Sequence, residues 1–125
     1  MIITKTPEQI EQMAAAGEIH ARCMKMLISM VRPGVTTAEL DRAAEKLIRA
    51  RGATPSFKGY RGFPGSICAS PNSLVVHGFP SDEPLSRGDI LSIDLGVTSD
   101  GWVADAAVTL AVGPVDETAT HLLSV

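Results

Sequence analysis

Apolar residues recur at near-helical spacing in the first part of the chain and predict two helices. The first helix is expected from Pro7, because Thr6-Pro7-Glu8-Gln9 combines an N-cap, a first-turn proline and a capping box, and it should end at Arg32-Pro33-Gly34. The second follows another capping box, Thr36-Thr37-Ala38-Glu39, and should end at Gly52. The apolar positions of the two helices are Ile10, Met13, Met24, Leu27 and Val31, then Leu40, Ala43, Ala44, Leu47 and Ile48.

From Ala53 onward the pattern changes to short apolar runs between turns rich in glycine and proline, which is typical of strands. Strands are expected at residues 67–69 and 74–77 and as a hairpin over residues 88–113, GDILSIDLGVTSDGWVADAAVTLAVG. An acidic cap at Asp116-Glu117 starts a third helix. Helices followed by antiparallel strands predict an α+β fold.

The alternation within the hairpin assigns its two aspartates to one face. Odd-numbered residues of the first strand and even-numbered residues of the second are apolar, and these rows share a face only if odd residues pair with even ones. With a tight turn at Ser99-Asp100-Gly101, Asp94 lies opposite Asp105 or one diagonal step away. Both carboxylates are therefore expected on the face away from the core, with Leu91, Ile93 and Trp102 on the other.

Two like charges at this separation destabilise a strand pair unless something neutralises them. A divalent cation, a shared proton or exposure to water would each relieve the repulsion. The alanines near Asp105 (Ala104, Ala106 and Ala107) leave room for close approach, and we favour the cation. Carboxylates suit ions such as Mn, Co, Fe or Mg, and two of them can bridge a pair of ions.

Other side chains leave alternatives open from local sequence alone. His77, before Gly78-Phe79-Pro80, is a ligand or proton donor, or else a structural or exposed residue. His20 and His121 are interpreted as structural or exposed. The side chains that either line a pocket or fill the core are Tyr60, Phe63 and Cys68.

Composition narrows the class of protein. A length of 125 residues suits one domain, and a net charge of -3 gives no basic surface for nucleic acid or anionic lipid. No apolar run approaches the roughly 18 residues of a membrane helix, and the start lacks a signal peptide, so we expect a cytoplasmic protein. Cys23 and Cys68 fall in no zinc-binding pattern and are expected to be reduced.

Together these segments resemble the type I methionine aminopeptidases, which have the pita-bread metallopeptidase fold. The resemblance covers most of residues 4–113. The segments KTPEQIEQMAAAGEI and RPGVTTAELDRAAEKLI are similar to that family's first two helices, and GYRGFPGSICASPNSLVVHGFP to its substrate-pocket and histidine segment. The hairpin is similar to its first metal-binding hairpin. Two departures are Phe63, where tyrosine is frequent, and the turn Pro71-Asn72-Ser73.

The resemblance implies a metal-dependent hydrolase that removes the initiator methionine from nascent polypeptides whose second residue is small. Asp94 would chelate one of two divalent ions (Co, Mn, Fe or Zn), and Asp105 would bridge both. His77 would hydrogen-bond the scissile amide. The residues that would line the pocket for the methionine side chain are Tyr60, Phe63 and Cys68.

The resemblance further implies that residues 1–125 form the N-terminal half of one peptidase domain and end within a third helix. The family's remaining ligands, a histidine and two glutamates, and a second substrate histidine belong to the C-terminal half. By itself the chain is expected to be inactive, to hold metal poorly and to self-associate. Two alternatives are a peptidase-like module that binds proteins without catalysis and a relative of the proline-specific aminopeptidases.

Overall fold

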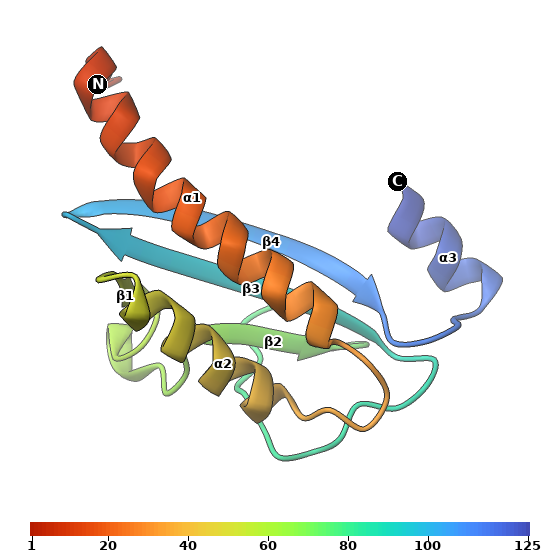
Figure 1. The fold of residues 1–125 in the computed structure, drawn as a ribbon. Helices are drawn as coiled ribbons and strands as arrows, with labels where there is room; N and C mark the ends of the chain where they lie inside the picture. The colour runs from red at the N-terminus through yellow and green to blue at the C-terminus, as the bar shows by residue number, and fades with distance from the viewer.

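The computed structural model describes all of residues 1–125 as three α-helices and a four-stranded antiparallel sheet (Figure 1). The helices are α1 (Pro7–Met30), α2 (Thr37–Ala50) and α3 (Glu117–Ser124). The strands are β1 (Thr54–Pro55), β2 (Ile67–Pro71), β3 (Ile90–Ser99) and β4 (Trp102–Ala111), with a short 3₁₀ turn, η1, at Tyr60–Gly62. The α+β prediction is therefore confirmed.

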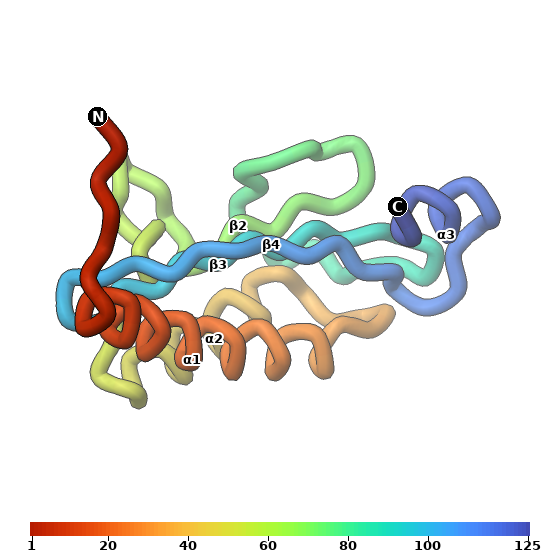
Figure 2. Tube along the Cα trace, turned by 90° about the horizontal axis from the view of Figure 1, so that it is seen from above, coloured from red at the N-terminus to blue at the C-terminus, as the bar shows by residue number.

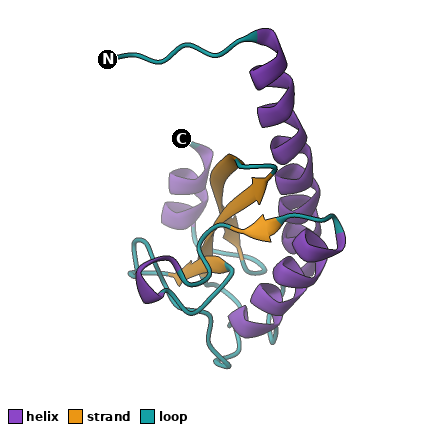
Figure 3. Ribbon diagram, turned by 90° about the vertical axis from the view of Figure 1, so that its left-hand side faces the viewer, coloured by secondary structure: helices purple, strands orange, loops and turns teal.

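The two long helices begin where their capping boxes predict. The Thr6 side chain accepts a hydrogen bond from the backbone N–H of Gln9, and Thr36 does the same for Glu39. Figures 2 and 3 show α1 and α2 side by side on one face of the sheet, while the loop after β2 covers part of the other. None of the helices combines the length and apolar composition that crossing a bilayer requires.

Strand β3 is the centre of the sheet. It pairs with β4 along its whole length on one edge, and with β2 and then β1 on the other. Its odd-numbered residues from Leu91 to Val97 are fully buried against the helices, because alternate side chains of a strand point to opposite faces. The main fully buried core side chains are Leu91, Ile93, Leu95 and Val97 of β3 with Leu27, Leu40 and Ile48 of the helices.

The β3–β4 turn also follows the sequence prediction. Ser99 pairs with Trp102, so the loop has two residues, Asp100 and Gly101, and both have positive φ (49° and 81°). Aspartate followed by glycine suits this turn because both tolerate the left-handed conformation. The turn fixes the pairing of all residues between the two strands.

The strand predicted at residues 74–77 is wrong. After β2 the chain turns at Asn72 (φ 52°), and residues 74–77 run exposed without joining a sheet ladder. His77 has φ 58°, a left-handed conformation that interrupts any strand. The apolar run Leu74-Val75-Val76 thus indicated a strand that backbone geometry does not allow. Strand β1 was not expected from the sequence.

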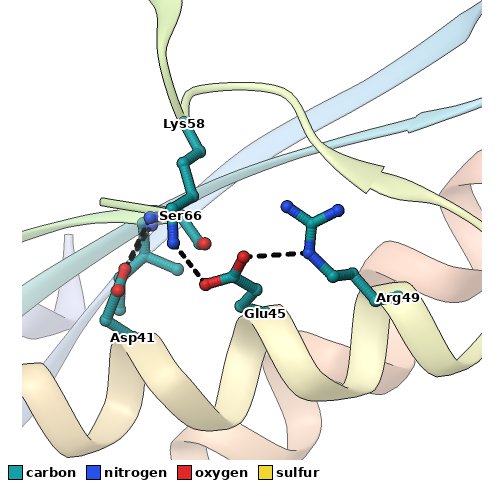
Figure 4. Close-up of polar contacts among 6 residues, drawn as sticks. Asp41, Glu45, Arg49, Lys58 and Ser66 are labelled. Carbon is teal, nitrogen blue, oxygen red and sulfur yellow. Dashed lines mark hydrogen bonds and ion pairs between the residues drawn. The ribbon is translucent and has the colours of Figure 1, made fainter. Parts of the chain in front are cut away.

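Helix α2 fixes the start of β2 and the loop before it (Figure 4). Asp41 accepts hydrogen bonds from the backbone N–H groups of Ser66 (2.6 Å) and Ile67 (3.0 Å). One turn later, Glu45 forms an ion pair with Lys58 at the other end of this loop. Both ends of residues 58–66 are therefore held by carboxylates of one helix.

We expect Asp41→Ala to lower the free energy of unfolding by about 2 kcal/mol, because two partly buried N–H groups lose a charged acceptor. Urea unfolding of the purified chain measures this change. Asp82→Ala is the matched control, since Asp82 is exposed and accepts no hydrogen bond, and it should change stability by less than about 0.5 kcal/mol. Equal effects of the two substitutions would show that Asp41 does not anchor β2.

Candidate functional site

The β3–β4 hairpin places two aspartates on its outer face. Asp94 pairs with Ala107, and Asp105 pairs with Gly96. Asp94 and Gly96 are two residues apart in one strand and share a face, so the two aspartates lie one diagonal step apart on that face. This confirms the predicted parity. The face opposite carries Leu91 and Ile93, which are fully buried.

The two carboxyl groups are close enough to affect each other's ionisation. Partial burial raises the pKa of Asp94, and the charge and direct side-chain contact of Asp105 raise it further. His77 and the N–H of Leu95 act in the opposite direction. The ion pairs of the chain join Arg22 to Glu18, and Arg49 and Lys58 to Glu45, so no lysine or arginine neutralises the two aspartates.

Strand β2 brings a thiol beside this pair. Cys68 lies directly opposite Asp94 in the β2–β3 register and is 5% exposed. Burial raises the pKa of Cys68 to about 11, with a smaller contribution from the negative charges of Asp94 and Asp105. The thiol therefore stays protonated at neutral pH and acts as a small neutral wall, not as a nucleophile. Both cysteines are free, as predicted.

A close approach of the backbone holds His77 beside the aspartates. The next residue, Gly78, accepts a hydrogen bond from the Ala69 N–H (3.0 Å) and donates one to the Ser70 hydroxyl (3.0 Å). A Cβ atom on Gly78 would lie 2.1 Å from the Ala69 carbonyl oxygen, so only glycine allows this contact. The contact ties the exposed imidazole of His77 to β2.

Aromatic side chains complete a pocket of about 480 Å³ over the hairpin. Phe63 lies between two other rings in edge-to-face contacts, with centroid distances of 6.5 Å to Phe57 and 5.3 Å to Phe79. Tyr60 is 65% exposed at the pocket and carries the Arg61 guanidinium above its ring. The lining residues are Phe57, Tyr60, Arg61, Gly62, Phe63, Cys68, His77, Phe79, Asp94 and Asp105.

All six candidate site residues therefore line one pocket, and Tyr60, Phe63 and Cys68 belong to its wall and not only to the core. Sequence reasoning missed Phe57, Phe79 and Arg61. The Phe57 ring lies where a side chain at Gly96 would be, 2.7 Å from the Cβ position. The glycine inside an otherwise apolar strand is the one sequence signal that could have indicated a ring packed there.

The remaining histidines lie outside the pocket. His20 is buried on α1 and contacts backbone carbonyls of the hairpin, and His121 is exposed on α3. No group of three or more His, Cys, Asp or Glu side chains in the chain could hold a metal ion. The metal-binding groups of the pocket are thus an adjacent carboxylate pair without a counterion. Such a pair can supply two ligands of a divalent cation, and further ligands are needed to complete its coordination.

We expect Gly78→Ala to lower the free energy of unfolding by about 2 kcal/mol or more, because the added methyl group clashes with the backbone of β2. Gly17→Ala is a control with the opposite expected sign. Gly17 lies inside α1 with no atom near its Cβ position, so alanine should stabilise the helix by about 0.5–1 kcal/mol. Thermal unfolding of both variants tests this; an unchanged melting temperature for Gly78→Ala would contradict the close approach.

We expect Asp105→Asn to stabilise the metal-free chain at pH 7, because it removes the repulsion between the two carboxylates. The gain in the free energy of unfolding should be only about 0.5 kcal/mol, since solvent screens a partly exposed pair. Folding raises the pKa of Asp94, so ionisation of Asp94 destabilises the fold above that pKa. The gain in the free energy of unfolding should shrink as the pH falls and vanish below the pKa of an aspartate in the unfolded chain, about 3.9. Unfolding in EDTA across this pH range measures it.

The control for Asp105→Asn is Asp100→Asn, which removes the same charge from the hairpin turn, where asparagine is equally suited. A gain of the same size in both variants would mean that net charge, and not the carboxylate pair, is responsible.

The chain is similar to known proteins in both sequence and structure. The chain is 50% identical to a methionine aminopeptidase of Clostridium perfringens, over all 125 residues of this chain and 50% of that protein. The structure matches the crystal structure of methionine aminopeptidase from Rickettsia prowazekii with a TM-score of 0.96 at 38% identity, over 99% of this chain and 50% of that one. The chain thus spans about half the length of the curated relatives it matches.

The match to prolidase from Pyrococcus furiosus is weaker, with a TM-score of 0.83 at 28% identity, over 95% of this chain and 34% of that one. The resemblance to methionine aminopeptidases and the predicted half of the pita-bread fold are therefore confirmed. The model of metallopeptidase family M24 matches residues 11–125. On this match, and with the carboxylate pair and pocket in place, the chain belongs to metallopeptidase family M24.

Proposed function

We propose that this chain provides the methionine-binding pocket and the first metal ligands of an enzyme that removes N-terminal methionine from nascent polypeptides. One observation carries the proposal: a single pocket joins a carboxylate pair that forms no ion pair with lysine or arginine to a wall of aromatic rings. The similarity to methionine aminopeptidases supports it. Cytoplasmic location belongs to the same proposal, since that is where the initiator methionine of a new polypeptide would be removed.

Asp94 and Asp105 are the proposed metal ligands. Membership of a metallopeptidase family implies the use of divalent metal, and Co, Mn, Fe and Zn are the candidates, with Asp94 holding one ion and Asp105 bridging two. The bound metals would activate water for attack on the peptide carbonyl. Residues 1–125 contain no third ligand beside this pair, so we expect the chain alone to bind metal weakly and to be a poor hydrolase.

The aromatic part of the pocket is the proposed site for the methionine side chain. Phe63 and Tyr60 offer ring surfaces, and a thioether makes favourable contacts with aromatic rings. The protonated thiol of Cys68 adds no charge that would repel an apolar side chain. Polypeptides that begin with methionine and a small second residue are the proposed substrates.

His77 is the proposed group that contacts the scissile amide. Its backbone is held by the contact of Gly78 with β2, and it lines the same pocket as both aspartates. A neutral imidazole can donate one hydrogen bond, which would orient the amide between the methionine pocket and the carboxylate pair. In this role His77 binds no metal.

The test uses a fusion of residues 1–125 to the remaining half of the Clostridium perfringens relative, loaded with Mn²⁺ or Co²⁺. We expect Asp105→Ala to lower hydrolysis of a Met-Ala peptide by about 100-fold or more and to reduce the metal content. His77→Ala should lower kcat by about 10- to 100-fold while the metal content stays unchanged. Metal analysis and peptide hydrolysis of each variant measure these effects.

Asp100→Asn, at the exposed hairpin turn, is the control and should leave both quantities unchanged. Loss of metal from the His77 variant would show that its proposed role is wrong. A fusion that binds metal and cleaves Xaa-Pro peptides but not Met-Ala peptides would favour the proline-specific relatives. A fusion that binds peptides without cleaving any would favour a binding module.

A further inference from the structure

His20 is a buried polar residue of α1, the helix that lies along one face of the sheet (Figure 2), and it does not line the pocket. It lies on α1 with 7% of its surface exposed, and its Nε2 atom is 2.9 Å from the carbonyl oxygen of Leu95 and 3.4 Å from that of Ala106. Carbonyl oxygens only accept hydrogen bonds, so Nε2 carries a proton and donates it. One imidazole thus joins α1 to both strands of the hairpin.

The two carbonyl groups belong to the residues that directly follow the aspartates. Leu95 follows Asp94, Ala106 follows Asp105, and Leu95 and Ala106 lie opposite each other in the β3–β4 register. The two contacts of His20 are therefore one residue away from each aspartate along its own strand.

The outer face of β4 is open at Asp105. Strand β4 pairs only with β3, and its odd-numbered residues, including Asp105, are exposed. Repulsion between the two carboxylates acts to move β4 away from β3 or along it. The ladder hydrogen bonds resist such movement along the whole hairpin. The bonds of His20 resist it at Leu95 and Ala106, the residues next to the two carboxylates.

We propose that His20 is a positioning residue for the carboxylate pair. It holds the backbone of both strands from the α1 side and so sets the spacing of Asp94 and Asp105 for a divalent ion. That the pair binds a divalent ion rests on the proposed function. The contact between His20 and the hairpin is given by the distances in the structure. The metal affinity of the pair therefore depends on a side chain that binds no metal.

The test compares three variants of the chain. His20→Leu removes the donor and keeps an apolar side chain, His20→Gln keeps an N–H donor, and Leu27→Val trims another fully buried α1 residue. The first readout is the carboxyl ¹³C shifts of Asp94 and Asp105 without metal. The second is Mn²⁺ affinity, measured by paramagnetic broadening of the hairpin signals, with thermal unfolding recorded alongside.

We expect His20→Leu to shift both carboxyl signals and to weaken Mn²⁺ binding about tenfold or more, as is usual when a residue that orients a ligand is removed. His20→Gln should restore much of both. Leu27→Val should lower the melting temperature and leave both readouts unchanged. Unchanged readouts in His20→Leu, or equal changes in Leu27→Val, would overturn the inference.

The two proposals fail separately. Absence of Mn²⁺ broadening in the unaltered chain, or broadening that survives Asp94→Asn, would contradict the metal role of the pair. The carboxyl shifts in the metal-free chain would still decide whether His20 sets the spacing of the aspartates.

Discussion

Electrostatic repulsion between two neighbouring carboxylates on one hairpin face is the constraint on which the site depends. Asp94 and Asp105 have no cationic side chain to neutralise them, and the raised pKa of Asp94 reflects partial burial and the charge of its neighbour. The β3–β4 ladder, fixed by its two-residue turn, keeps them together. An arrangement that is unfavourable for the empty protein is favourable for binding a divalent cation.

The pocket around the pair is assembled from segments that have little regular structure of their own. Asp41 of α2 accepts two backbone hydrogen bonds at the start of β2, which fixes where Cys68 lies. Gly78 lets the loop behind His77 touch β2, and Gly96 leaves space for the Phe57 ring. These contacts lie between residues distant in sequence, and each one depends on a small residue or a single acceptor.

The contrast between local patterns and contacts of residues distant in sequence explains how much of the molecule could be predicted. Both long helices and the hairpin were predictable because capping boxes, apolar periodicity and the Asp-Gly turn act over a few residues. The same periodicity misassigned residues 74–77, since it carries no information about the left-handed conformation at His77. The pocket role of Phe57 depends on a steric gap in a strand about forty residues later, which no local pattern reveals.

The partners of β3 change at the pocket. Residues 91–95 pair with β2 and residues 97–98 with β1, and Gly96 lies between them, bonded through its carbonyl to the N–H of Ser56. The pocket thus sits over an interruption of the sheet edge, while the carboxylates belong to the uninterrupted β3–β4 ladder. Evolution can therefore change the width of the pocket through residues 56–66 while the carboxylate pair stays in register.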